Sequence, residues 1–168
     1  MKNKWKLVSV LGLAAVAAFN ASIGVPVASE LGKDSRNSGL TIVAYRSFGL
    51  HPTDVTLNIL TAENVAPADV FRATFQAAQA LKDRRFGQIN LVRGLSHIYS
   101  MRGEDFQEIG REFEAGQNPV YLIRTLPEKL FLPDGSSAFG TWTGGLLGVV
   151  TQQMDDVNSA ARTWLGVE

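Results

Sequence analysis

Apolar residues follow three kinds of pattern along this chain. The first is a continuous apolar run of 13 residues at Leu7–Phe19. In the second, apolar side chains recur every three or four positions, which is typical of one face of an amphipathic helix. The third is alternation or β-rich composition, which favours strands. Helical spacing covers 67–83, 106–113 and 146–165, and strand patterns cover 40–48, 55–60 and 88–101.

Proline and glycine mark the boundaries of these elements. Pro67 suits the first position of a helix, where its missing N–H is harmless. Gly116 is placed as a C-cap of the helix that opens near 103. Gly94 separates two β-rich runs, so 88–101 is predicted to be a hairpin. Two segments stay ambiguous between strand and helix: 55–60, where alternation favours a strand, and 120–126.

Strands separated by helices predict an α+β fold. We expect a small antiparallel sheet with a central hairpin, packed by about three helices. The last of these is a long C-terminal helix from about Thr143 to Leu165, whose apolar face is large enough to contribute most to the core. Residues 40–168 are predicted to form a single globular domain, a size that supports one core.

The first 29 residues have the order of a secretory signal peptide. A basic start precedes the apolar run, and small polar residues follow it. Small residues at the −3 and −1 positions predict cleavage after Ser29, leaving Glu30 first, and a cut before Val25 is the alternative. The run is shorter than the ~20 residues of a spanning helix. An uncleaved membrane anchor and a helix of the fold remain open.

Residue composition indicates a flexible leader and a cellular location for the protein. Residues 30–39 are polar and rich in Ser, Asn and Gly, so they are predicted to form a flexible leader. The chain has no cysteine, which excludes disulfides, thiolate metal sites and cysteine nucleophiles. Small secreted eukaryotic domains are usually rich in disulfides, so this composition favours a bacterial periplasmic or secreted protein. Anchoring by the N-terminal segment is the alternative location.

The net charge indicates which classes of binding partner are expected. The formal net charge is zero, and the mature chain is slightly acidic. Neither value predicts binding to nucleic acid or to an anionic membrane surface. The expected partner is therefore a protein or small molecule of the cell envelope, and membrane contact is expected only through an uncleaved signal segment.

Two histidines are the only candidates for acid–base chemistry near neutral pH. His51 and His97 would each need a carboxylate and a serine to form a hydrolytic triad. No G-x-S-x-G nucleophile elbow occurs, and the histidine spacing does not fit a zinc site. No cofactor is predicted. The groups considered with the histidines are Asp54, Glu104, Asp105, Ser136 and Ser137.

A glycine-rich stretch, 138–150, precedes the C-terminal helix. It lacks the lysine of a phosphate-binding loop, so close packing of the helix is favoured over anion binding. Nearby, an arginine lies within the apolar run 120–126, where an unpaired charge is costly to bury. It is expected to reach solvent, to pair with Glu112 or Glu128, or to face a ligand, and pairing is favoured. A ligand pocket, if present, is predicted to be lined by Tyr121, Arg124, Trp142, Gly144 and Gly145.

The leading hypothesis is an exported bacterial protein that serves as a non-enzymatic binding or structural module. It follows from the N-terminal segment, the single domain and the lack of a catalytic motif. The first alternative is a small exported hydrolase that uses His51 or His97 with a carboxylate. The second is a membrane-tethered module that keeps its signal segment as an anchor.

Overall fold

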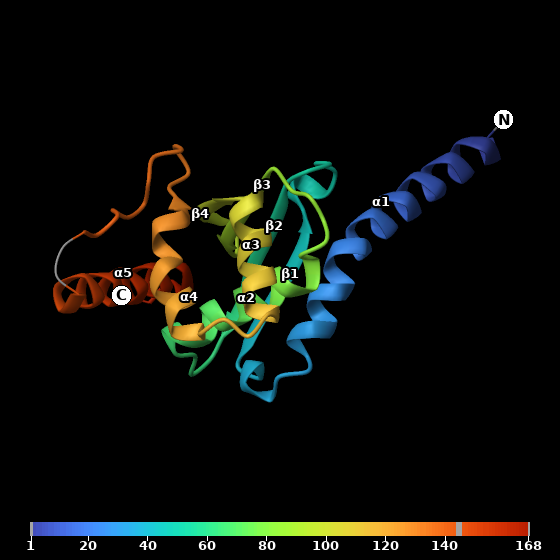
Figure 1. The fold of residues 1–168 in the computed structure, drawn as a ribbon. Helices are drawn as coiled ribbons and strands as arrows, with labels where there is room; N and C mark the ends of the chain where they lie inside the picture. Colours follow the sequence, from blue (N-terminus) through green and yellow to red (C-terminus); the bar gives the residue numbers. More distant parts are fainter. Residues whose placement is uncertain (1, 144–145, 168) are drawn as a thin grey trace.

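The protein is described from a computed structural model that covers residues 2–143 and 146–167. These residues form five α-helices and a five-stranded sheet, which confirms the α+β fold. Figure 1 shows how the elements are arranged. The helices are α1 Lys2–Leu31, α2 Pro67–Leu81, α3 Gly103–Glu114, α4 Pro119–Thr125 and α5 Leu146–Leu165. The strands are β1 Leu40–Arg46, β2 Val55–Ala62, β3 Gln88–Arg93, β4 Ser96–Arg102 and β5 Leu130–Phe131.

The strands lie in the sheet in chain order, from β1 to β5. Neighbours are antiparallel except β2 and β3, which are parallel because α2 carries the chain back between them. The sheet is therefore mixed, whereas an antiparallel sheet was expected. Arg46 pairs with Val55, and Val55 pairs with Ile89, so β1 ends where β2 and β3 begin. We call this end of the strands the proximal end of the sheet. The opposite end, which carries the β3–β4 turn, is the distal end.

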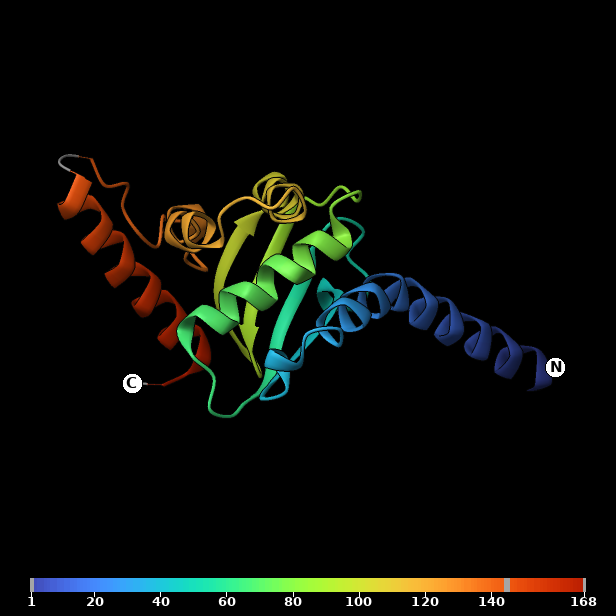
Figure 2. The ribbon, with the colours of Figure 1, turned by 60° about the horizontal axis from the view of Figure 1, so that its bottom comes forward.

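The core lies between the sheet and α2, which crosses one of its faces (Figure 2). Phe71 and Phe75 of α2 are fully buried against strand residues such as Leu57. Helix α3 packs on α2 at Gly110, where a Cβ atom would lie 2.4 Å from the carbonyl oxygen of Ala78. Such a contact requires glycine, so this residue sets the spacing of the two helices.

The two halves of α1 have different surroundings. The inner half packs against β1 and α2, with Ile23 and Val27 fully buried and Leu31 nearly so. The outer half projects from the proximal end into solvent (Figures 1 and 2), and Leu13 is 73% exposed. Within the described part of the chain, α1 is the one helix long and apolar enough to cross a membrane, over Gly12–Leu31.

The segment predicted as a flexible leader, 30–39, is folded onto the domain. It contains the end of α1 and a 3-10 turn, Ser35–Asn37. Asn37 is buried, and its Nδ2 donates to Leu31 O at 2.9 Å and to Gln76 Oε1 at 2.7 Å. Its polar composition, which suggested disorder, instead supplies hydrogen bonds to α2.

The other expected elements are found close to their predicted positions. Segment 55–60 is a strand and 120–126 is mostly helical, which settles both ambiguities. Helix α5 is the expected C-terminal helix, and its Trp164 is buried with Nε1 donating to Val92 O at 3.0 Å. At the two described glycines of the glycine-rich stretch the expected close packing is not seen, because Cβ atoms at Gly140 and Gly148 would meet no atom within 4 Å.

Candidate functional site

The junction between α1 and the domain is held by one asparagine. The side chain of Asn20 donates from Nδ2 to Gly49 O at 2.7 Å and accepts at Oδ1 from Arg46 N at 2.9 Å. Both partners belong to the end of β1 and the loop that follows it. Because both bonds involve backbone groups, the start of the β1–β2 loop is fixed beside the point where α1 leaves the domain.

The guanidinium of Arg46 connects three segments at this junction. Its central carbon lies 4.6 Å from the ring centroid of Phe19 on α1 and 5.9 Å from that of Phe86, after α2. Its Nη1 donates to Pro52 O in the β1–β2 loop, while its buried Nε has no hydrogen-bond partner. Burial, and secondarily the positive charge of Arg84, lowers the pKa of Arg46 below its ordinary value. Helix and domain are thus joined without a linker.

The β1–β2 loop presents two large apolar side chains to solvent. Phe48 is 96% exposed and Leu50 is 64% exposed. Phe48 has a φ of 54°, in the left-handed region that a bulky residue rarely adopts. Ser47, next to it, is buried, and its Oγ lies 3.0 Å from Thr56 Oγ1. The loop therefore has a buried polar base and an exposed apolar tip.

The sheet face opposite the helices carries a network of polar side chains. Gln88 Nε2 donates to Asn90 Oδ1 at 2.7 Å and to Ser100 Oγ at 2.9 Å. Asn90 Nδ2 donates to Ser47 Oγ at 2.9 Å, which links the network to the β1–β2 loop. At the other side, His97 Nε2 lies 3.0 Å from Ser100 Oγ. We call these residues the open-face network.

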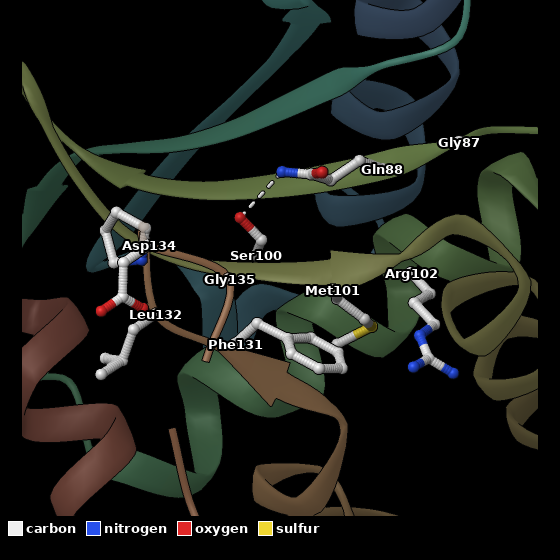
Figure 3. Close-up of a pocket in the computed structure, with 10 residues that line it drawn as sticks. Gly87, Gln88, Ser100, Met101, Arg102, Phe131, Leu132, Asp134 and Gly135 are labelled. Carbon is white, nitrogen blue, oxygen red and sulfur yellow. Dashed lines mark hydrogen bonds between the residues drawn. The ribbon is translucent and has the colours of Figure 1, made fainter. Parts of the chain in front are cut away.

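Two hollows flank the open-face network. One, of about 360 Å³, lies at the β4–β5 side, where Gln88 and Ser100 face each other above Phe131 and Arg102 lies at one end (Figure 3). The other, of about 280 Å³, extends from Phe48 to the β3–β4 turn at Leu95. Amide and hydroxyl groups lie between the two hollows. This surface has hydrogen-bond donors and acceptors for a polar ligand or a polypeptide.

The geometry at His97 disfavours a hydrolytic role. Its Nε2 lies 3.0 Å from both Tyr99 O and Ser100 Oγ. A carbonyl oxygen only accepts, so we assign the proton to Nε2, and this nitrogen is then unable to take a proton from Ser100. Among the described residues, no carboxylate contacts His97. The carboxylates proposed for it contact cations instead, Asp105 with Lys129 at 3.0 Å and Glu104 with Arg102 at 4.0 Å.

The other predicted triad groups are also separated. His51 Nδ1 lies 3.4 Å from Asp54 Oδ2 and accepts from Asp54 N, but among the described residues no serine hydroxyl is hydrogen-bonded to its ring. Ser136 belongs to a turn, where both its N and its Oγ donate to Asp134 Oδ1. These two bonds lower the pKa of Asp134 below its ordinary value. One histidine thus has a serine and the other has a carboxylate, and neither has both.

The predicted ligand-binding residues are not connected by any described contact. Tyr121 and Arg124 lie on α4, and the buried Nε of Arg124 has no hydrogen-bond partner. Trp142 Nε1 donates to Asp156 Oδ2 on α5 at 2.6 Å. Within the described ranges Arg124 forms no ion pair, and its suggested partner Glu128 accepts from a glutamine of α5 instead. Gly144 and Gly145 lie outside the described residues, so this pocket stays a prediction.

The predicted cleavage site lies within α1. Ser29, Glu30 and Val25 are all helical, and the helix includes Pro26. Cleavage at either position therefore stays a prediction. Within the described ranges, no group of three or more His, Asp and Glu side chains is placed to hold a metal ion.

Sequence reasoning missed the residues of the junction. Two signals were present: Asn20 ends the uninterrupted apolar run, and Phe48 and Leu50 flank a glycine in a turn, where polar residues are usual. No protein-family model, curated protein or solved structure matches the chain.

Proposed function

We propose that the protein is a membrane-tethered binding module that keeps α1 as an uncleaved anchor and presents the open-face network to a partner. One observation carries the proposal: Ile23 and Val27 of α1 are fully buried against β1 and α2. A segment destined for removal has no need to supply side chains to the core of the domain it leaves.

The energetics support retention of α1. Full burial of a Val or Ile side chain stabilises by ~1.5–3 kcal/mol relative to exposure. Cleavage after Ser29 would remove Ile23, Val27 and both bonds of Asn20. The loss of several kcal/mol is comparable to the ~5–15 kcal/mol total stability of a typical domain. A cut before Val25 would leave Val27 but still remove Ile23 and Asn20.

The charge pattern gives the anchor an orientation. Lys2, Lys4 and Lys6 precede the apolar run without any acidic residue. Basic residues flanking a membrane helix stay on the cytoplasmic side. The domain then lies on the opposite side of the membrane, which agrees with an exported protein.

A binding role, rather than an enzymatic one, fits the open face. The hollows beside the open-face network offer hydrogen-bonding groups and apolar edges, whereas His97 lacks the arrangement of a general base. The partner class is a polypeptide or polar small molecule of the cell envelope.

The first experiment is intact mass and N-terminal sequencing of the protein from separated cell fractions. We expect a full-length chain in the membrane fraction that resists extraction at alkaline pH. A soluble chain beginning at Val25 or Glu30 would contradict the proposal.

A matched pair of variants tests the structural premise separately. Val27→Ala removes a fully buried side chain, whereas Val25→Ala, two residues away in the same helix, changes one that is 63% exposed. The first should lower the free energy of unfolding by ~1.5–3 kcal/mol, and the second by at most ~0.5 kcal/mol. Equal effects would show that burial of Val27 does not stabilise the domain, which would contradict the structural premise.

A further inference from the structure

We propose that the proximal end of the domain is seated in the bilayer interface, with Phe48 and Leu50 at the acyl-chain boundary and Arg84 and Arg85 at the lipid phosphates. The inference rests on the proposed retention of α1 and goes beyond it, because an anchor alone does not require the domain to touch the membrane.

The β1–β2 loop lies beside the point where the anchor leaves the domain. Helix α1 leaves the domain at Asn20, which is bonded to Gly49 and Arg46. Phe48 and Leu50 flank Gly49, so they lie beside the anchor as it emerges from the domain. Figures 1 and 2 both show the outer half of α1 extending from this end. The helix has no linker there that would hold the domain away from the bilayer.

The apolar part of α1 outside the domain is shorter than the hydrocarbon core of a bilayer. The apolar run outside the domain, Leu7–Phe19, has 13 residues, which in a helix measure about 20 Å. The hydrocarbon core of a bilayer is ~30 Å thick. The apolar residues that would extend the span, Ile23 and Val27, are occupied in the protein core. Local thinning and snorkelling of the N-terminal lysines cover part of the deficit. Seating the domain directly on the interface covers more.

The β1–β2 loop exposes apolar surface at the proximal end. Phe48 is 96% exposed and is held in a left-handed conformation, which costs on the order of 1–3 kcal/mol for a residue of this type. Leu50, two positions later, is 64% exposed. A bulky apolar side chain kept outward at such a cost is expected where an apolar phase receives it.

In the described part of the chain, the proximal end carries arginines without carboxylate partners. Among the described residues, Arg46, Arg84 and Arg85 have no carboxylate within 4.0 Å. The acids nearby in sequence have other neighbours: Asp54 lies 3.4 Å from His51, and Asp83 lies 3.7 Å from Lys82. Unpaired arginines attract the phosphates of lipid headgroups.

The test uses the lack of cysteine in the chain, which allows one label per variant. Phe48→Cys, Leu95→Cys and Leu13→Cys are made in the full-length protein and labelled with a polarity-sensitive fluorophore. All three side chains are highly exposed, so folding should not be affected. The proteins are reconstituted in phosphatidylcholine–phosphatidylglycerol vesicles that contain a lipid with a nitroxide quencher near the interface.

Leu95 is the matched control, because it is a fully exposed apolar residue at the distal end. We expect the label at position 48 to be quenched at least about twofold more than the label at position 95. Quenching at 13 but not at 48 would overturn the inference and leave the anchor intact. Lack of quenching at all three positions would instead overturn the proposed function.

The arginines are tested in the same assay. Arg84→Gln combined with Arg85→Gln should reduce the quenching at position 48 in vesicles with phosphatidylglycerol and have little effect in pure phosphatidylcholine. Equal quenching of the double variant and its parent in both kinds of vesicle would overturn the role of the arginines. Because the assay contains only lipid, quenching at 48 also separates membrane contact from contact with a protein partner.

Discussion

The outer and inner halves of α1 are similar in composition but differ in their neighbours. Leu13 is 73% exposed, whereas Ile23 and Val27 are fully buried. Both halves belong to one uninterrupted helix. An apolar N-terminal helix therefore acts as signal, anchor or core according to what packs against it, because the hydrophobic effect depends on the area removed from water rather than on composition.

The largest expected effect is at the buried side chains of the inner half. Ile23→Ala should lower the free energy of unfolding by ~2–5 kcal/mol, since it removes a buried side chain and leaves a cavity. Leu13→Ala, in the outer half, should change it by at most ~0.5 kcal/mol. Urea titration of both variants in mild detergent measures the difference. Similar small effects would mean that the inner half does not pack as described.

Replacing glycine by alanine should change the stability of the protein in opposite directions in the two halves. A Cβ atom at Gly24 would lie 2.9 Å from Ala44 O, whereas one at Gly12 would meet no atom within 4 Å. Gly24→Ala should therefore destabilise by ~1–3 kcal/mol through overpacking against β1. Gly12→Ala should stabilise the helix by ~0.5–1 kcal/mol. Thermal unfolding followed by circular dichroism gives both signs, and a stabilising Gly24→Ala would contradict the close approach.

A smaller effect is expected where the halves meet. Asn20→Ala removes the bonds to Gly49 and Arg46, which should cost about 1–2 kcal/mol. It should also increase hydrogen exchange in the loop after β1. Ser22→Ala is the control, since the described hydrogen bond of the Ser22 side chain is to Phe19 O within the same helix. Unchanged exchange in Asn20→Ala would show that the loop is fixed by other contacts.

The smallest effect concerns the turn after the inner half and depends on pH. Asp34 bonds to Arg36, lies 3.3 Å from Arg72 and accepts from Gln76 at 2.8 Å. The bond to Arg36, together with the backbone and Gln76 bonds, lowers the pKa of Asp34 well below its usual range. A lowered carboxyl pKa stabilises the fold above the unfolded-state value, and this contribution is lost as pH falls.

Asp34→Asn should therefore destabilise the protein at neutral pH, and the gap to the parent should close as pH falls below ~4. Urea titrations of both proteins between neutral and acidic pH measure this gap. A gap that does not vary with pH would show that the charge of Asp34 has no part in the effect.

Local patterns predicted most of the elements. The periodicity after Pro67 corresponds to α2, the β-rich runs around Gly94 correspond to β3 and β4, and Gly116 follows α3 with a φ of 77°. These signals are local, because residues three or four positions apart share a helix face and alternate residues share a strand face. Their accuracy did not depend on the rest of the fold.

The predictions that required long-range contacts were less successful. The parallel pairing of β2 and β3 depends on the path of α2, and the folding of 30–39 depends on Gln76, far away in the sequence. The candidate site was missed for the same reason. Asn20, Arg46 and Phe86 are separated in the chain, and only the tertiary structure brings them together at the junction.

By itself, the sequence determined the α+β class, an apolar N-terminal segment and the absence of cysteine chemistry, since each depends on composition or short periodicity. The tertiary structure decided how α1 is divided between solvent and core, and which polar groups face the open side of the sheet. The physical reason is that burial and hydrogen bonding are properties of neighbours in space, which a linear pattern does not specify.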